Sequence, residues 1–154
     1  MNHTIISSHE DWVEYEGKEL GYSDFIRITQ DQINHFAEAT GDRQWIHTDI
    51  ERAKKESPYN STIAHGYLTV SLIPILLGQI IEARNTKMTV NYEIQDLRFN
   101  QPVLVDSEVR LNASVKEVKN LRGISKVTVS VTLEIRGQHK PAYTGSIVFL
   151  YHFK

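Results

Sequence analysis

The sequence predicts an α+β protein in which a group of helices is followed by an antiparallel sheet. Two observations lead to this fold class. Apolar residues recur with a helical period in the first half of the chain, and from Thr86 onward the period changes to two. Helices and strands that are segregated along the chain indicate α+β. The chain has 154 residues, so we expect residues 1–154 to form a single domain around one core.

Residues 29–41 carry the signals of a complete helix. Thr29 can act as N-cap, and Gln32 three positions later completes a capping box. Gly41 stands where a left-handed residue ends a helix. Asp42 is therefore expected just after the end of this helix.

Two more helices are expected before the sheet. Asp49 can cap a short helix over residues 50–56, which the sequence SPYNST then breaks. A third helix is expected from His65-Gly66 to about residue 82. Its apolar residues surround the whole cylinder, which predicts a buried core helix. Pro74 lies inside it and predicts a bend.

Strands are expected before and after these helices. A short one lies near residues 23–28, and several long ones follow Thr86. Alternation predicts that the following residues face the core: Met88, Val90, Tyr92 and Ile94; Val109, Leu111, Ala113 and Val115; Val127, Val129, Val131, Leu133 and Ile135. Residues 145–153 are apolar at both parities, which predicts a strand covered on both faces. A single wrapped sheet would leave an apolar edge or face in water, so we expect a homodimer or a dimer of dimers.

Composition excludes several classes of function. Lysine and arginine count 17 against 19 acidic residues, so nothing indicates binding to nucleic acid or to a membrane. The absence of cysteine excludes disulfides and thiol chemistry. The first residues lack a secretory signal, and residues 66–81 are too short and too polar for a membrane span, so a cytoplasmic protein is expected. The histidines show no metal-binding spacing, so no metal is expected.

The stretch ATGDRQWIHTDIERAKKESPYNSTIAHGYL, residues 39–68, contains the candidate chemistry. Asp42 stands five positions before His47, and a carboxylate and an imidazole can together hold and activate a water. The unpaired N–H at a helix start can stabilise an anion, and Gly66 has no side chain to block access to it. The spacing alone also fits an ordinary connection, in which Asp42 satisfies backbone donors and His47 neighbours a helix cap.

The same stretch resembles a known family signature. TGDRQWIHTD is similar to the hydratase signature of the MaoC-like, or (R)-specific enoyl-CoA hydratase, family, which runs G-D-x-N-P-[ILV]-H and is followed by H-G-[MFY]-L. The later DLRFNQPVLVDSEV resembles the family's L-x-R-F-x-x-P-V segment. This chain has Gln44-Trp45 where the family has Asn-Pro, and DRQWIH is more similar to the nodulation-protein-N-like branch.

The resemblance implies a hot-dog fold, in which a long central helix is wrapped by a curved antiparallel sheet, usually paired as a homodimer. It implies reversible hydration of trans-2-enoyl thioesters of coenzyme A or of an acyl carrier, without a metal or a redox cofactor. The implied catalytic groups are Asp42, His47 and the backbone N–H of Gly66. Substrate-binding residues are expected among Gln44, Trp45, His65, Tyr67 and Ser71.

Some assignments stay open on the sequence. His65 is expected to fix the turn or to hold a neighbouring carbonyl. Tyr67 and Ser71 fit either the pocket or the helix core, and Trp45 fits either a substrate wall or a loop anchor. Two other functions also fit. One is an acyl-CoA thioesterase in which Asp42 activates water against the carbonyl, and the other is a non-catalytic module that binds acyl thioesters.

Overall fold

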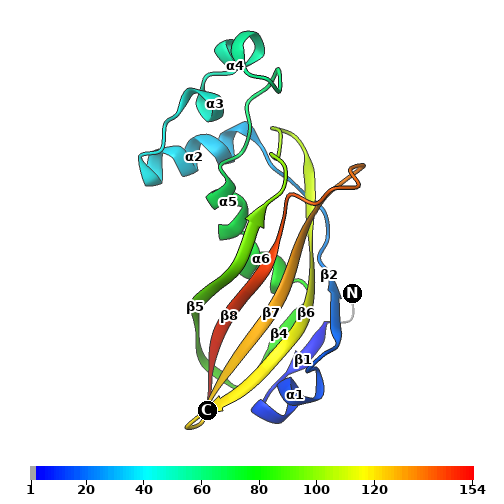
Figure 1. The fold of residues 1–154 in the computed structure, drawn as a ribbon. Helices are drawn as coiled ribbons and strands as arrows, with labels where there is room; N and C mark the ends of the chain where they lie inside the picture. The colour runs from blue at the N-terminus through cyan, green and yellow to red at the C-terminus, as the bar shows by residue number, and fades with distance from the viewer. Residues whose placement is uncertain (1–2) are drawn as a thin grey trace.

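The computed structural model describes residues 3–154 and shows a curved sheet packed against short helices (Figure 1). The helices are α1 (His9–Glu14), α2 (Gln30–Thr40), α3 (Trp45–Thr48), α4 (Ile50–Glu56), α5 (Gly66–Ser71) and α6 (Ile73–Leu77). The strands are β1 (Thr4–Ile6), β2 (Glu19–Tyr22), β3 (Ile26–Arg27), β4 (Ile81–Ala83), β5 (Thr86–Phe99), β6 (Glu108–Leu121), β7 (Ile124–Ile135) and β8 (Tyr143–Phe153).

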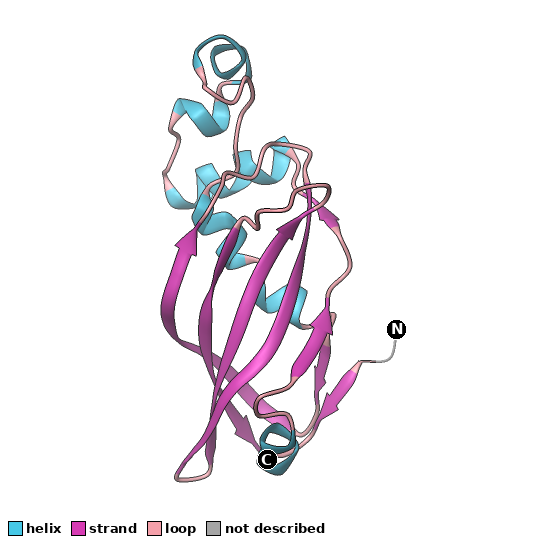
Figure 2. Ribbon diagram, turned by 45° about the vertical axis from the view of Figure 1, so that its right-hand side comes forward, coloured by secondary structure: helices cyan, strands magenta, loops and turns pink. Residues whose placement is uncertain are grey.

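The main sheet has the strand order β2-β6-β7-β8-β5, and β3 also pairs with β6. All of these pairs are antiparallel, whereas β1 and β4 form a separate parallel pair. Helices α5 and α6 lie along one face of the sheet, and α2, α3 and α4 extend beyond one of its ends (Figures 1 and 2). None of the helices within residues 3–154 has the length and apolar character that crossing a membrane requires.

The helix boundaries at α2 and α4 confirm the predictions made from their caps. The Thr29 side chain accepts a hydrogen bond from the Gln32 backbone N–H, and Gly41 ends α2 with a φ of 81°. Asp49 caps α4 by accepting a hydrogen bond from the Arg52 N–H. Local side-chain chemistry therefore determines both helices.

The core confirms the predicted faces of β6 and β7. The inward residues of both strands, including Leu111 and Leu133, are buried. Strand β8 is buried on both faces. Its consecutive residues Val148 and Phe149 point to opposite faces of the sheet and are 0% and 2% exposed. Strand β8 lies inside the sheet between β7 and β5, so the edge strand on that side is β5.

The prediction of one long, fully buried helix from His65-Gly66 to about residue 82 is wrong in both its extent and its burial. The chain is helical to Ser71 and again from Ile73, with the interruption two residues before Pro74. Proline lacks an N–H and its ring crowds the preceding turn, which explains the predicted bend. The helix ends at Leu77, and residues 81–83 pair with β1 instead. Only one face of α5 and α6 is buried in the single chain, because Tyr67 and Ile75 remain exposed.

Strand β5 also departs from the prediction, because a single face was expected to hold all its apolar residues. The pairing with β8 shifts register between Asn91 and Glu93. Opposed residues in an antiparallel pair share a face. Ile94 therefore faces the core side beside Ile147, whereas Val90, opposite Leu150, faces the other side. The β-bulge changes the parity within the strand.

The beginning of the chain is more structured than the sequence indicated. Within the strand expected near residues 23–28 only Ile26 and Arg27 form a strand, β3. Strand β2 ends just before it, and Ser23 exchanges hydrogen bonds with the backbone of Leu111 between the two. Strand β1, helix α1 and strand β4 were not predicted. Trp12 from α1 is fully buried, so this segment closes one end of the core.

We predict that the protein forms a homodimer in solution. The edge strand and the adjoining helices expose large apolar side chains, which are Tyr67, Ile75, Met88, Tyr92, Ile94 and Phe99. Exposed apolar side chains along an edge strand and its adjoining helices are typical of an interface. Light scattering at micromolar concentration should give the mass of two chains, or of four for a dimer of dimers. A single-chain mass would contradict the prediction.

Candidate active site

A cavity of about 500 Å³ lies where the start of α5 meets the loop after α2 and the connection from β5 to β6. Its lining contains three of the predicted site residues with chemistry to offer: Asp42, His47 and Gly66. The remaining lining residues are Tyr59, Ile63, Ala64, His65, Tyr67, Thr69, Phe99, Asn100, Gln101, Pro102, Val103 and Ala142. The structure therefore brings together residues that are far apart in sequence.

Asp42 lies in the loop that follows the left-handed Gly41. Its backbone N–H donates to the Thr40 hydroxyl at 3.3 Å, and one carboxylate oxygen accepts a long bond of 3.4 Å from the Gln44 N–H. The residue is exposed. One local bond to the carboxylate leaves further acceptor capacity for a ligand or a water.

His47 is 7% exposed, and its Nδ1 lies 2.7 Å from the carbonyl oxygen of Ile63. A carbonyl can only accept, so Nδ1 carries the proton and Nε2 carries the lone pair. Burial lowers the pKa of His47 and has the largest effect. The Ile63 carbonyl and the Asp42 carboxylate raise the pKa, and the neighbouring His65 lowers it further. His47 is thus held as a neutral imidazole with a basic Nε2.

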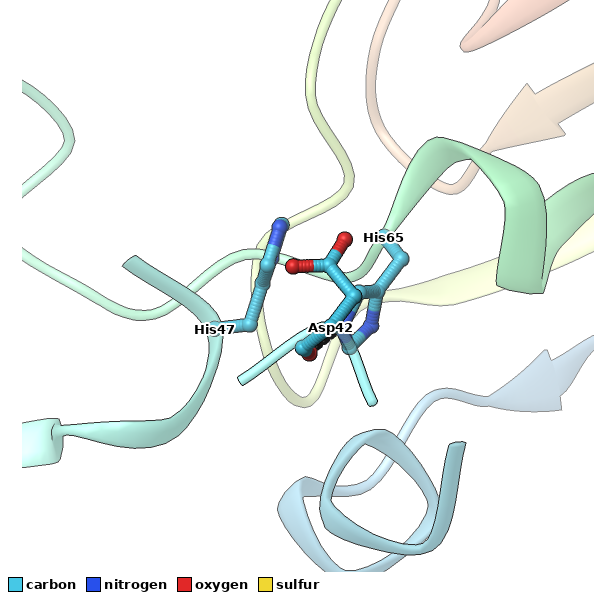
Figure 3. Close-up of side chains that lie close together, drawn as sticks. All are labelled: Asp42, His47 and His65. Atoms are coloured by element: carbon cyan, nitrogen blue, oxygen red, sulfur yellow. Dashed lines mark hydrogen bonds between the residues drawn. The ribbon is translucent and has the colours of Figure 1, made fainter. Parts of the chain in front are cut away.

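The carboxylate and the two imidazoles form one compact group (Figure 3). A carboxylate oxygen of Asp42 and one ring nitrogen each of His47 and His65 all lie within 4.8 Å of one another. A water that makes two hydrogen bonds of about 2.8 Å at a tetrahedral angle spans about 4.6 Å between its partners. One water can therefore bridge Asp42 and His47.

His65 contacts both of the other residues of this group. Its Nε2 is 2.9 Å from the backbone oxygen of Asp42 and therefore donates to it. Its ring stacks on that of His47, with centroids 3.9 Å apart and planes inclined by 24°. This confirms the expectation that His65 holds a neighbouring carbonyl.

Gly66 is the first residue of α5, so its N–H has no earlier turn of helix to accept it. The first turn is held by Thr69, whose hydroxyl donates to the Gly66 oxygen at 2.6 Å. A β-carbon on Gly66 would come within 2.9 Å of the Phe99 ring. Glycine at this position therefore allows the Phe99 ring to pack against the backbone. The sequence alone did not reveal this reason for a glycine.

The same three groups do not suit a single metal ion. A histidine binds a metal through a lone pair in the plane of its ring. The rings of His47 and His65 are stacked and nearly parallel, so their lone pairs do not converge on one point. One nitrogen of each ring also hydrogen-bonds a backbone carbonyl. Chemistry without a metal stays a prediction.

The expected substrate-binding residues divide into two groups. His65 and Tyr67 line the cavity, and Tyr67 is 75% exposed. Gln44, Trp45 and Ser71 lie outside its lining. Trp45 stacks under the Arg52 guanidinium at 4.3 Å, as a loop anchor would, and Ser71 bonds the Tyr67 carbonyl. Their contact with a substrate is therefore not supported in the single chain.

Other residues at the site were not predicted. Gln30 donates to the backbone oxygen of His47 at 2.7 Å and accepts from the Thr62 hydroxyl at 2.5 Å. No local sequence signal reveals such a long-range bond. Phe99 and Asn100 line the cavity and belong to the quoted DLRFNQPV segment, so this segment was the available signal.

Comparisons with known proteins identify relatives of this chain. The sequence model described as MaoC like domain matches residues 13–135. The 3-hydroxyacyl-thioester dehydratase Z of Mycobacterium tuberculosis is 43% identical over 88% of this chain and 89% of its own length. Nodulation protein N of Rhizobium leguminosarum bv. viciae is 39% identical over 89% of this chain and 86% of its own length.

A solved structure supports the same relationship. The (R)-hydratase from A. caviae involved in PHA biosynthesis superimposes with a TM-score of 0.69 and 27% identity, over 84% of this chain and 93% of that chain. The predicted hot-dog fold is thereby confirmed. The central helix of this chain is divided into α5 and α6.

We predict that His47 titrates below 6.5, the ordinary value for histidine, because burial disfavours its charged form. The unfolded chain then binds the proton more readily, so stability falls as the pH falls from 6.5 through the folded pKa. NMR titration of the imidazole, assigned with His47→Gln, measures the midpoint. A midpoint at or above 6.5 would contradict the neutral, buried His47.

Proposed function

The chain belongs to the family of MaoC-like domains, and from this premise we propose that it is a hydro-lyase acting on acyl thioesters. Its reaction is the reversible, (R)-specific hydration of a trans-2-enoyl thioester to a 3-hydroxyacyl thioester. The dehydratase and hydratase names of its relatives support the reaction class. The observation that carries the proposal is that a carboxylate oxygen of Asp42 and a ring nitrogen of His47 lie within 4.8 Å of each other in one cavity.

Hydration requires a water directed at C3 and a proton delivered to C2. In the proposed reaction Asp42 and His47 hold one water between them, and Nε2 of His47 accepts a proton while Nδ1 donates to Ile63. As the water oxygen bonds to C3, one O–H bond breaks and its proton passes to this pair. The pair returns a proton to C2, so the double bond becomes a C–OH and a C–H without any redox partner.

Negative charge develops on the thioester oxygen during this addition. The unpaired N–H of Gly66 at the start of α5 is placed to receive it. The Thr69 hydroxyl bond to the Gly66 oxygen and the Tyr143 hydroxyl bond to the Thr69 oxygen, at 3.1 Å, hold that turn. A donor that is fixed beforehand does not have to reorganise during the reaction.

The substrate class follows from the same arrangement. A donor for an oxyanion and an acid–base pair in one cavity suit a carbonyl conjugated with a double bond, as in an enoyl group carried on coenzyme A or on an acyl carrier protein. A cytoplasmic location is consistent with either carrier. No metal and no redox cofactor take part in this scheme.

An assay with crotonyl-CoA tests the reaction type. We expect the enoyl absorbance to decrease without release of free thiol, because water adds to the double bond and the thioester stays intact. Thiol release would indicate a thioesterase instead. Binding with neither change would indicate a module that holds acyl thioesters without turnover.

We predict that Asp42→Asn and His47→Gln each lower kcat by about 10²-fold or more, because neither replacement can transfer the proton. Both act on one water, so the double variant should lose much less than the product of the two losses. Steady-state hydration of crotonyl-CoA measures all three.

Matched controls make the same chemical changes outside the cavity. Asp49→Asn keeps a good helix cap on α4, and His35→Gln changes an exposed histidine on α2. Both controls should retain parental turnover. Parental turnover in Asp42→Asn and His47→Gln themselves would refute the assignment of the site.

A further inference from the structure

We propose that His65 is a positioning residue that holds the three proposed catalytic groups in one arrangement. This inference rests on the proposed function for the roles of Asp42, His47 and Gly66. His65 contacts the first through a hydrogen bond and the second through its ring, and it precedes the third in the chain. It does not itself transfer a proton in the scheme above.

The hydrogen bond to Asp42 is the first of these restraints. Asp42 is exposed, and its own bonds to Thr40 and Gln44 are long, at 3.3 and 3.4 Å. The bond from His65 Nε2 to the Asp42 oxygen is 2.9 Å, and its donor residue is only 3% exposed. A buried donor is shielded from competition with water, so this bond restrains Asp42 more firmly than its own bonds to Thr40 and Gln44 do.

The ring stack is the second restraint. A single bond from Nδ1 to the Ile63 oxygen fixes one atom of the His47 ring and leaves the plane of the ring free to rock. The His65 ring lies 3.9 Å away in a nearly parallel plane and removes this freedom. Phe36 packs on His65, with centroids 4.9 Å apart, so the stack is supported by α2.

The third restraint is covalent. His65 has extended backbone angles, with φ −59° and ψ 134°, and α5 begins at the next residue. Its carbonyl oxygen accepts the Thr69 N–H at 3.3 Å. When the side chain is anchored on the Asp42 loop and on His47, the direction of the Gly66 N–H is therefore tied to both.

Nδ1, the second ring nitrogen of His65, allows the positioning role to be tested by substitution. Within residues 3–154, Nδ1 of His65 is buried and has no hydrogen-bond partner. A replacement that lacks this atom therefore loses no bond there. Its effect reports the hydrogen bond to Asp42 and the stack on His47, which are also the two titratable groups that face His65 in the described cluster.

Two variants separate these contacts. His65→Gln keeps a donor of similar reach for the Asp42 carbonyl and loses the stack, whereas His65→Phe keeps an aromatic ring and loses the donor. His35→Gln is the control, because it makes the same change at an exposed histidine that contacts neither Asp42 nor His47. Thermal unfolding of each variant establishes that the protein is folded.

We expect kcat for crotonyl-CoA to fall by about 10-fold to 10²-fold in both His65 variants, with a smaller change in KM, because a displacement of about 1 Å is enough for such a loss. His35→Gln should keep the parental kcat. The NMR-measured pKa of His47 should rise more in His65→Gln than in His65→Phe, because burial is the main cause that lowers it and only His65→Gln removes the ring that shields His47 from water. A role of His65 through its charge alone would change the titration equally in both variants.

The two readouts distinguish failure of this inference from failure of the proposed function. The His47 titration needs no substrate, so it decides the positioning role even if the parent protein does not hydrate crotonyl-CoA. A His47 titration that changes equally in the folded His65→Gln and His65→Phe variants, or in neither, overturns the inference. If His65→Phe does not fold, His65→Tyr serves as the variant that keeps an aromatic ring.

Discussion

The backbone of Thr62–Ala64 is the constraint on which the candidate site depends. The Ile63 N–H donates to the Ile46 oxygen, and the Ile63 oxygen accepts from the ring of His47. On the other side, Ala64 donates to Val103, and an isolated bridge joins residues 63 and 104. This short extended segment therefore joins α3 to the connection between β5 and β6, and it leads directly into α5. Displacing it would move both His47 and the start of α5.

Burial and hydrogen bonding act together on the chemistry of this site. An imidazole that is removed from water resists protonation, and the Ile63 carbonyl selects the tautomer that leaves Nε2 basic. The carboxylate of Asp42 stays exposed beside it. A neutral base and an accessible carboxylate thus occur within one cavity because one lies on a packed helical turn and the other on a loop.

The fold was predictable where the physical cause is local. Caps at Thr29 and Asp49 and a left-handed Gly41 determine helix ends through groups only a few residues apart. Alternation determined the buried faces of β6 and β7, because both strands run through the middle of the sheet without a change of face in the core region. Alternation failed on β5, where a bulge changes parity. The helix expected to about residue 82 was wrong at residues 81–83, which form β4 and pair with β1.

The sequence by itself determined the fold class, the order of the main helices and long strands, and the three residues that carry the proposed chemistry, because spacing and motif are local properties. Only the tertiary structure decided how these residues act on one another. The tautomer of His47 depends on a carbonyl sixteen positions away, and the Asp42 loop depends on His65, twenty-three positions away. Such contacts arise when separate segments pack around the same cavity, so no pattern of neighbouring residues contains them.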